Sequence, residues 1–464
     1  MSYLRRRWIN NSLANLIGGV ATAAVNILLP ALVVKHFSTE AFSVWNLSLQ
    51  LLVYVNLLSA GLQTATARAV AHAGPHDNSA HSPAVIVRAA RSISRWAAGC
   101  ALVLVLLLAA GYPLLFPGVP STLVVEFRLT LLFFGFAAVV QILAQVYLGI
   151  FQGLHRNVVL VGVQIAVRLL TLMVVWVGVL IELPLVALAA LMACASTLLW
   201  PAMLERFNIL VPWAANANQA SLDKVCRQVL LKYCSTLFIW SVSMLLVNAV
   251  GIIIVGRVNF PMVGPYAIAM TATSVLVGLV NAALAPLMTT TASMFAKDSS
   301  RQELPALLLK CTIGTAIALN LVAIFVEAQQ TFILQAWVGE AYANAAAPIL
   351  IILVGAHCLR NICAPYSLML LAVGLHRRAL ASALFEGVAN LIASVVMGTI
   401  WGAIGVAFAT LFSAAIGVTG TFLFNARHTP ELTPNAIQFA FRGLILPTIL
   451  FMPIHVYYLM AFPK

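Results

Sequence analysis

The sequence predicts an all-α polytopic membrane protein with two pseudo-symmetric six-helix bundles, twelve core helices in all, followed by one extra helix. Three observations predict it: an apolar composition, regular segmentation into long apolar stretches, and a repeat between the two halves. Of the 464 residues, 62% are hydrophobic and 8% are charged, and the mean hydropathy is +1.03. Soluble proteins carry roughly 25% charged residues, so most of this surface must face lipid.

The chain has a formal net charge of +13. Basic residues form short clusters between apolar stretches, as the positive-inside rule describes, and this placement argues against nucleic-acid binding. The seven cysteines form no CxxC pair, so we expect small hydrophobic side chains and no disulfide framework. The main basic clusters are Arg5–Arg7, Arg88/Arg91/Arg95, Lys224/Arg227/Lys232, Lys297/Arg301 and Arg377–Arg378.

Apolar stretches long enough to cross ~30 Å of hydrocarbon divide the chain into spans. The first lobe, 1–210, has predicted spans at 12–34, 43–67, 96–116, 128–152, 157–180 and 184–204. A polar linker follows at 211–231, and we expect it to be cytoplasmic. The second lobe, 232–428, has predicted spans at 232–256, 262–290, 308–330, 345–373, 379–401 and 403–425. A thirteenth candidate lies at 437–461 within an extra C-terminal segment, 429–464.

The distribution of basic residues predicts the orientation of the chain. With the N-terminus in the cytoplasm, most of the 25 lysines and arginines fall in cytoplasmic segments, while Lys35, Arg128, Arg257 and Lys464 fall outside. Cytoplasmic loops are enriched in Lys and Arg. The sequence therefore predicts a cytoplasmic N-terminus and short outer loops.

An internal repeat relates the two halves. The tetrapeptide Gly-Leu-His-Arg occurs at 153–156 and again at 374–377, an offset of 221 residues, and each copy joins the fourth span of its half to the fifth. Asn26 and Asn248 follow a nearly identical offset. A repeat of six spans keeps the same membrane orientation, so we expect a pseudo-two-fold axis along the membrane normal, a substrate site between the halves and transport by alternating access.

Several short stretches resemble the start of bacterial polysaccharide-export flippases. They are Asn10–Asn15, Phe37–Trp45, Gln50, Leu57–Leu62 and Ala67–Ala71, with an echo at Val263–Ala267. The chain is similar through about residue 428 to Wzx-type lipid-linked oligosaccharide flippases of the multidrug/oligosaccharidyl-lipid/polysaccharide (MOP) exporter superfamily. It differs where Phe42–Trp45 replaces a Tyr-Gly-Leu-Trp-like turn.

The resemblance implies a MATE-like, V-shaped pair of lobes in the bacterial inner membrane. It also implies transfer of an undecaprenyl-pyrophosphate-linked glycan from the cytoplasmic to the outer leaflet, for O-antigen, capsule or exopolysaccharide assembly. The expected partners are this lipid-linked glycan, membrane lipids, and a polysaccharide polymerase with its chain-length machinery; no nucleic acid is expected. No enzymatic activity and no cofactor are expected, and either H⁺ or Na⁺ is the candidate coupling ion.

Three charged residues lie well inside predicted spans, where a charge is expensive and usually faces a cavity or a partner. Arg168 and Arg360 are candidates to bind the pyrophosphate, since a guanidinium matches phosphate oxygens. The alternatives for each are a buried ion pair or a hydrogen bond to free backbone carbonyls, and Arg360 has Glu386 within marginal reach. Glu386 is the acidic candidate for proton or ion coupling. His357 shares a helical face with Arg360 and Asn361 and is a second coupling candidate, although a hydrogen-bonded core histidine is the commoner role.

Polar amides and aromatic rings punctuate the spans, and a sugar cavity needs both kinds of side chain. The alternatives are interhelical hydrogen bonds for the amides and interfacial belts for the rings. The predicted cavity residues are Asn26, Asn248, Gln145, Asn361, Asn390, Tyr54 and Tyr366, and further amides include Gln63 and Gln164. No metal site is predicted, because His72, His76, His81 and Asp77 lack the spacing of metal ligands.

Three other functions stay open. A cation-coupled multidrug antiporter of the same superfamily would be expected to have a carboxylate inside its first lobe, and no predicted span there has one near its centre. A membrane-embedded polysaccharide polymerase or glycosyltransferase would need a sizeable outer loop with catalytic side chains, but the outer loops are short. An inert assembly scaffold would not require charges inside the membrane.

Overall fold

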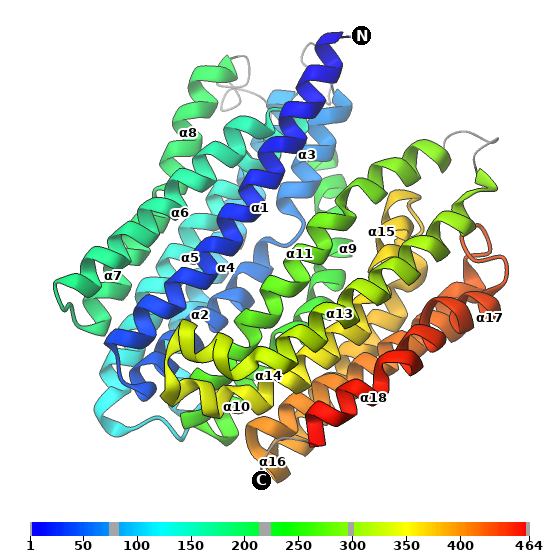
Figure 1. Ribbon diagram of the computed structural model, residues 1–464. Helices are drawn as coiled ribbons and strands as arrows, with labels where there is room; N and C mark the ends of the chain where they lie inside the picture. The colour runs from blue at the N-terminus through cyan, green and yellow to red at the C-terminus, as the bar shows by residue number, and fades with distance from the viewer. Residues whose placement is uncertain (1, 74–82, 213–223, 296–300, 461–464) are drawn as a thin grey trace. The chain divides into compact units, whose positions relative to one another are not determined.

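A computed structural model describes residues 2–73, 83–212, 224–295 and 301–460, and all the regular secondary structure in these ranges is helical (Figure 1). The chain divides into two compact units, Met1–Val242 and Ser243–Lys464, with the division inside helix α9 (Lys224–Asn248). The predicted lobe boundaries stay predictions. Most of the predicted linker, and three of the four residues considered for a metal site, lie outside the described residues.

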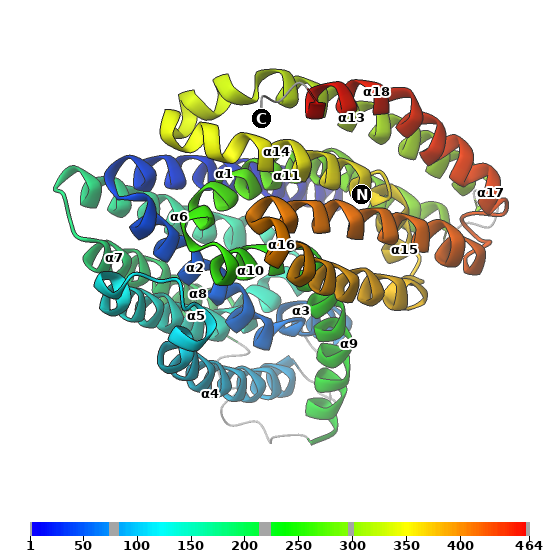
Figure 2. The same cartoon turned by 90° about the horizontal axis from the view of Figure 1, so that it is seen from below.

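The first unit consists of long apolar helices that pack side by side. Within it, α1 lies along α6, and α5 packs against α2, α3, α4 and α7 (Figures 1 and 2). Its helices, with the first part of α9, are α1 (Ser2–His36), α2 (Thr39–Asn56), α3 (Leu62–Ala73), α4 (Pro83–Leu115), α5 (Val124–Gly153), α6 (Asn157–Leu180), α7 (Leu185–Thr197) and α8 (Leu199–Leu210).

The predicted second span is broken at Gly61, which separates α2 and a short 3₁₀ turn from α3. Gly61 has φ of +82°, and a Cβ there would lie 2.7 Å from the Cβ of Leu237 in α9. Only glycine adopts this backbone region without strain. The break therefore follows from both the local conformation and the close approach of α9.

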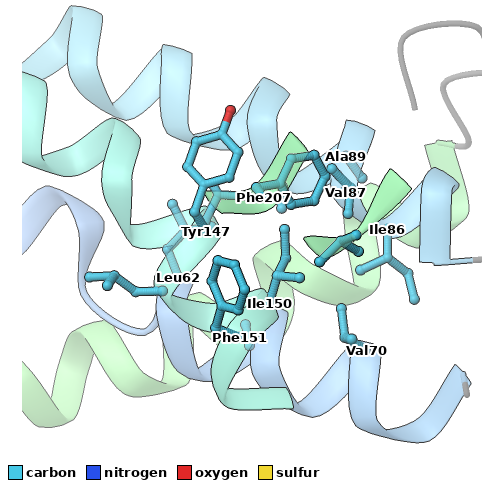
Figure 3. Close-up of a cluster of buried hydrophobic side chains, with 14 of the residues drawn as sticks. Leu62, Val70, Ile86, Val87, Ala89, Tyr147, Ile150, Phe151 and Phe207 are labelled. Atoms are coloured by element: carbon cyan, nitrogen blue, oxygen red, sulfur yellow. The ribbon is translucent and has the colours of Figure 1, made fainter. Parts of the chain in front are cut away.

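The core of the first unit gathers apolar side chains from α3, α4, α5 and α8 (Figure 3). Tyr147 and Phe207 pack edge to face, with ring centroids 5.3 Å apart, and the Arg91 guanidinium lies over both rings. A basic residue at this end of α4 thus stacks on aromatic rings. The labelled members of the cluster are Leu62, Val70, Ile86, Val87, Ala89, Tyr147, Ile150, Phe151 and Phe207.

In the second unit, α14 is the most buried of the candidate spans. It packs against α11, α13 and α16, while α18 lies along α13 (Figures 1 and 2). Its helices, after the end of α9, are α10 (Val250–Val258), α11 (Val263–Phe295), α13 (Leu304–Val338), α14 (Glu340–Asn361), α15 (Ala364–Ala372), α16 (Leu380–Gly420), α17 (Ala436–Phe439) and α18 (Leu446–Met460).

Helix α16 is a hairpin that reverses at Gly402, where φ is +61° and ψ is −141°. A Cβ at Gly405 would overlap the carbonyl oxygen of Met397. Farther from the bend, Ser413 donates to Asn390 Oδ1 at 3.1 Å and Asn425 Nδ2 donates to Ser382 at 2.6 Å. The two arms are therefore antiparallel, as predicted for separate spans at 379–401 and 403–425.

We expect Gly402→Ala to destabilise the protein, because its backbone conformation is open essentially to glycine alone and costs other residues about 1–3 kcal/mol. Gly314→Ala is the matched control: Gly314 lies in α13, a Cβ there meets no atom within 4 Å, and alanine favours helix. Thermal unfolding in detergent measures both. A Tm for Gly402→Ala equal to that of the control would contradict the strained hairpin.

The described residues contain twelve helical segments long and apolar enough to cross a membrane. One of them, Leu380–His428, contains the hairpin, and another, Ala436–Tyr457, corresponds to the predicted extra C-terminal span. The predicted fold class is confirmed: the chain is a multi-pass, all-helical membrane protein.

Candidate functional site

A polar cavity of about 290 Å³ lies in the first unit between α1, α3, α5 and α6. Amide, hydroxyl and guanidinium groups supply more than half of its described wall, inside helices that are otherwise apolar. The lining residues are Gly18, Gly19, Thr22, Gln63, Gln152, Asn157, Leu160, Val161, Gln164, Ile165 and Arg168. We call this cavity the first-unit pocket.

Helix α6 supplies one whole wall of the first-unit pocket. Asn157, Gln164 and Arg168 are spaced at i, i+7 and i+11, which places them on one helical face. Arg168 lies ~16 Å along the axis from Asn157 at 1.5 Å per residue. The pocket wall therefore runs from the Gly-Leu-His-Arg turn into the span.

Two adjacent glycines of α1 have different roles in the opposite wall. A Cβ at Gly18 would lie 2.8 Å from Val161 Cγ1, whereas a Cβ at Gly19 would meet no atom within 4 Å. Gly18 thus permits close packing of α1 on α6, as small residues do between membrane helices. Gly19 leaves space in the pocket, beside Thr22.

The third wall brings together amides from α3 and α5. Gln63 Nε2 donates to Gln152 Oε1 at 2.9 Å. This contact is possible because Gly149 and Gly153 let α5 touch the α3 backbone at Gln63 and Ala67, where a Cβ would overlap carbonyl oxygens.

The first-unit pocket also contains unused hydrogen-bonding capacity. Asn157 Oδ1 is buried and has no hydrogen-bond partner among the described residues. A buried, unpaired acceptor is costly unless a ligand or water satisfies it. The pocket is therefore equipped to bind a polar molecule.

Arg168 is the only charged residue among the described residues that line the first-unit pocket. The side chain is half-buried, and no ion pair or hydrogen bond joins it to any side chain that the structure describes. An arginine inside a membrane span requires a counter-charge or a water-filled cavity. The pocket is therefore suited to an anion.

The second unit contains a separate polar cluster around Arg360 of α14. Its Nε donates to Glu386 Oε1 at 2.6 Å and its Nη2 to Ser413 Oγ at 3.3 Å. The side chains of Arg360 and Glu386 are 15% and 10% exposed. The carboxylate lies against Gly417 on the other arm of α16, where a Cβ would overlap it. The ion pair anticipated as an alternative for Arg360 is confirmed.

Asn390 extends this cluster to the end of α9. Its Nδ2 donates to the carbonyl oxygens of Leu246 and Val247 at 2.8 and 3.2 Å, and its Oδ1 accepts from Ser413. The side chain is 1% exposed. Asn390 therefore ties α16 to α9, where the helix ends at Asn248 and leaves carbonyl groups without helical partners.

The other second-unit residues predicted to line a cavity or couple an ion do not join the hydrogen bonds around Arg360. His357 is buried one turn before Arg360, and Asn361 Nδ2 donates to the His357 carbonyl oxygen within α14. Tyr366 is 1% exposed in the core around α15, and its hydroxyl lies 2.8 Å from Thr429 Oγ1. Asn248 is exposed and donates to Met244 of its own helix.

The remaining predicted residues of the first unit lie outside the described lining of the first-unit pocket. Asn26 is exposed on α1, and Gln145 is half-buried in α5. The hydroxyl of Tyr54 is buried without a hydrogen-bond partner among the described residues. Their roles in substrate binding stay predictions, as do those of the predicted residues in the second unit.

Sequence reasoning named Gln63, Gln164 and Arg168 but not Thr22, Gln152 or Asn157. The spacing of Asn157, Gln164 and Arg168 on one face of a predicted helix was the available signal. The pocket residues on α1, α3 and α5 could not be found from their spacing in the sequence, because their place in the pocket depends on which helices pack together.

No protein-family model matches the chain, and no curated protein matches it in sequence. Solved structures match in fold. The chain is similar to the lipid II flippase MurJ in an inward closed conformation, with a TM-score of 0.65 and 16% identity over 98% of this chain and 100% of MurJ. It is also similar to an inward-facing multidrug resistance MATE transporter of the MOP superfamily. The TM-score is 0.67, and the 14% identity extends over 93% of this chain and 95% of the transporter. A third match is a MOP superfamily transporter from Pyrococcus furiosus, described as having a binding pocket of reverse polarity that suggests a different function. The TM-score is 0.57, and the 14% identity extends over 97% of this chain and 96% of that transporter.

Proposed function

We propose that the chain is a flippase for a lipid-linked oligosaccharide. The cargo is an undecaprenyl-pyrophosphate-linked glycan, moved from the cytoplasmic to the outer leaflet of the bacterial inner membrane for surface polysaccharide assembly. The observation that carries the proposal is the first-unit pocket: a cavity inside membrane helices, lined by amides and by one cation without a described partner.

The chemistry of the first-unit pocket fits both parts of such a headgroup. A guanidinium binds phosphate oxygens through paired hydrogen bonds, which assigns the pyrophosphate to Arg168. The amides of Gln63, Gln152 and Gln164 offer donors and acceptors to sugar hydroxyls. The pocket begins beside the turn at 153–156, predicted to be cytoplasmic, so a headgroup would enter from that side.

The fold supports alternating access as the mechanism of transfer. MurJ is described as a lipid II flippase, and MATE structures of this fold are described as inward-facing and outward-facing. Coupling to H⁺ or Na⁺ through Glu386, or to H⁺ through His357, belongs to the same proposal. Because Glu386 is paired with Arg360, an ion bound there would have to displace the guanidinium.

A second candidate function is a cation-coupled multidrug antiporter, favoured by the buried carboxylate of Glu386 in a MATE-like fold. The charge of the first-unit pocket argues against it, because an unpaired arginine repels a cationic drug. The two functions therefore predict opposite cargo charge.

The leaflet distribution of lipid-linked glycan in the host, with and without the chain, tests the proposal. We expect depletion to accumulate the glycan on the cytoplasmic face and re-expression to reverse this. An unchanged distribution combined with a loss of organic-cation export would overturn the proposal in favour of the antiporter.

Filling the first-unit pocket should block transport without unfolding the protein. We expect Gly19→Phe to lower glycan transfer by roughly tenfold or more, a loss of at least about 1.4 kcal/mol of binding free energy, because Gly19 lines the pocket and a large side chain there would occupy the cavity. Gly162→Phe, in α6 outside the described lining, is the control, since a Cβ there also meets no atom within 4 Å. Equal transfer by both variants, in protein with unchanged Tm, would contradict the assignment of the pocket.

A further inference from the structure

Three polar side chains meet between α13 and α18, away from the Arg360–Glu386 pair. His455 of α18 lies between Glu327 and Asn320, which are seven residues apart on one face of α13. His455 Nδ1 is 2.9 and 2.8 Å from the two carboxylate oxygens of Glu327, and its Nε2 is 2.9 Å from Asn320 Oδ1. Both ring nitrogens of the histidine therefore face oxygen atoms.

The orientation of the Asn320 amide is set by a second contact. Asn320 Nδ2 donates to the Ala316 carbonyl oxygen at 2.7 Å, so Oδ1 is the atom that faces His455. Carboxylate and amide oxygens are both acceptors, whereas a neutral imidazole has a single N–H. With Glu327 ionised, the two contacts of His455 can be satisfied together only by the doubly protonated imidazolium.

The positive charge on His455 matters for stability because the groups around it are buried. Glu327 is 2% exposed and Asn320 is 6% exposed, while the His455 side chain is 18% exposed. A carboxylate buried inside membrane helices needs a counter-charge, and His455 is its only salt-bridge partner among the described residues. One proton on the ring thus supplies both the second hydrogen bond and the balancing charge.

No other charged group described around α18 can replace His455. Helix α18 packs on α13, on α14 and on the turn that precedes it, residues 440–445. On α14, the Cys358 thiol lies near Glu327 and donates to the Leu319 carbonyl oxygen, and Arg360 is paired with Glu386. Arg442, in the preceding turn, is exposed and forms no ion pair with Glu327.

We propose that Glu327, His455 and Asn320 form a proton-binding site whose occupancy controls the packing of α18 on α13. With the proton bound, α18 is held at both ring nitrogens. When it leaves, the neutral ring has one N–H for two acceptors, and the buried carboxylate loses its counter-charge. Packing of α18 therefore weakens as the pH rises through the titration of the site. The site does not depend on the identity of the cargo.

Hydrogen–deuterium exchange of the full chain in lipid nanodiscs, over a pH series, tests the proposal. After correction for the intrinsic pH dependence of exchange, we expect the rate in peptides covering 446–457 to rise roughly tenfold or more with pH in the unsubstituted chain, as for loss of a buried charge pair. His455→Gln should abolish this rise, because its amide does not titrate. His36→Gln, which changes a first-unit histidine with a single backbone contact to Leu183, should leave it intact. The same pH profile in His455→Gln and the unsubstituted chain would overturn the proposal.

If His455→Gln fails to fold, a second variant and an NMR measurement of the histidine ring still test the proposal. Asn320→Leu removes one acceptor and keeps the histidine, so a neutral ring can still donate its one N–H to Glu327 and the rise in exchange should shrink. In ¹⁵N-histidine NMR of the unsubstituted chain, we expect two protonated nitrogens for His455 below the transition and one above it. A neutral ring throughout the pH range in which α18 stays protected would overturn the proposal.

Discussion

Replacing Arg168 by alanine is expected to reduce glycan transfer by about 100-fold, with little change in Tm. Removing one partner of a buried, charge-assisted contact costs about 2–5 kcal/mol, and 100-fold corresponds to about 2.8 kcal/mol. The stability should hardly change, because Arg168 has no described ion-pair partner to leave behind. Transfer of lipid-linked glycan in proteoliposomes, measured with the unfolding temperature of the same preparation, gives both values.

Further substitutions at this position separate charge from shape. Arg168→Lys keeps the positive charge but loses the paired hydrogen bonds to phosphate, so we expect intermediate transfer, whereas Arg168→Glu should abolish it. Arg206→Ala, at an exposed position of α8, is the control for a general loss of positive charge from the first unit. Normal transfer by Arg168→Ala would remove Arg168 from the proposed headgroup site.

Replacing Arg360 by alanine is expected to destabilise the second unit by about 3–5 kcal/mol, because it leaves the Glu386 carboxylate buried without a counter-charge. Glu386→Ala should have a similar effect, since it leaves the guanidinium buried instead. The expected consequence in thermal unfolding is a large fall in Tm for either variant.

The double variant Arg360→Met, Glu386→Leu distinguishes structural from functional roles of the pair. Replacing a buried ion pair by apolar residues of similar volume is often neutral or stabilising, so we expect this variant to recover most of the lost stability. If the pair also takes part in transport, the refolded variant will fail in glycan transfer. Recovery of both stability and transfer would show that Arg360 and Glu386 serve packing alone.

The two polar clusters differ in a way that assigns them different tasks. In the first unit, Arg168 faces a cavity and has no described partner. In the second, Arg360 is held by Glu386 and Ser413, and Asn390 links the cluster to α9. The unpaired cation is available to an anionic ligand, whereas the paired one must first be released.

Much of this architecture could be predicted from the sequence. The spans are long and apolar, the charges inside them are few, and a charge in lipid is costly at any position along a helix. The span 157–180 coincides with α6, and a glycine at 402 separates two predicted spans that fold into the hairpin. These features follow from local composition and backbone conformation, which a sequence displays directly.

Apart from the Arg360–Glu386 pair, the partners of the polar side chains were decided only by the tertiary structure. Glu327 is 2% exposed and contacts His455, which lies 128 residues away along the chain. Gln63 meets Gln152 because glycines of α5 bring two helices into backbone contact. Hydropathy shows how far a helix extends and which residues belong to it. Hydrogen bonds and ion pairs between helices depend on how each helix is rotated toward its neighbours. That rotation is set by packing across the whole unit.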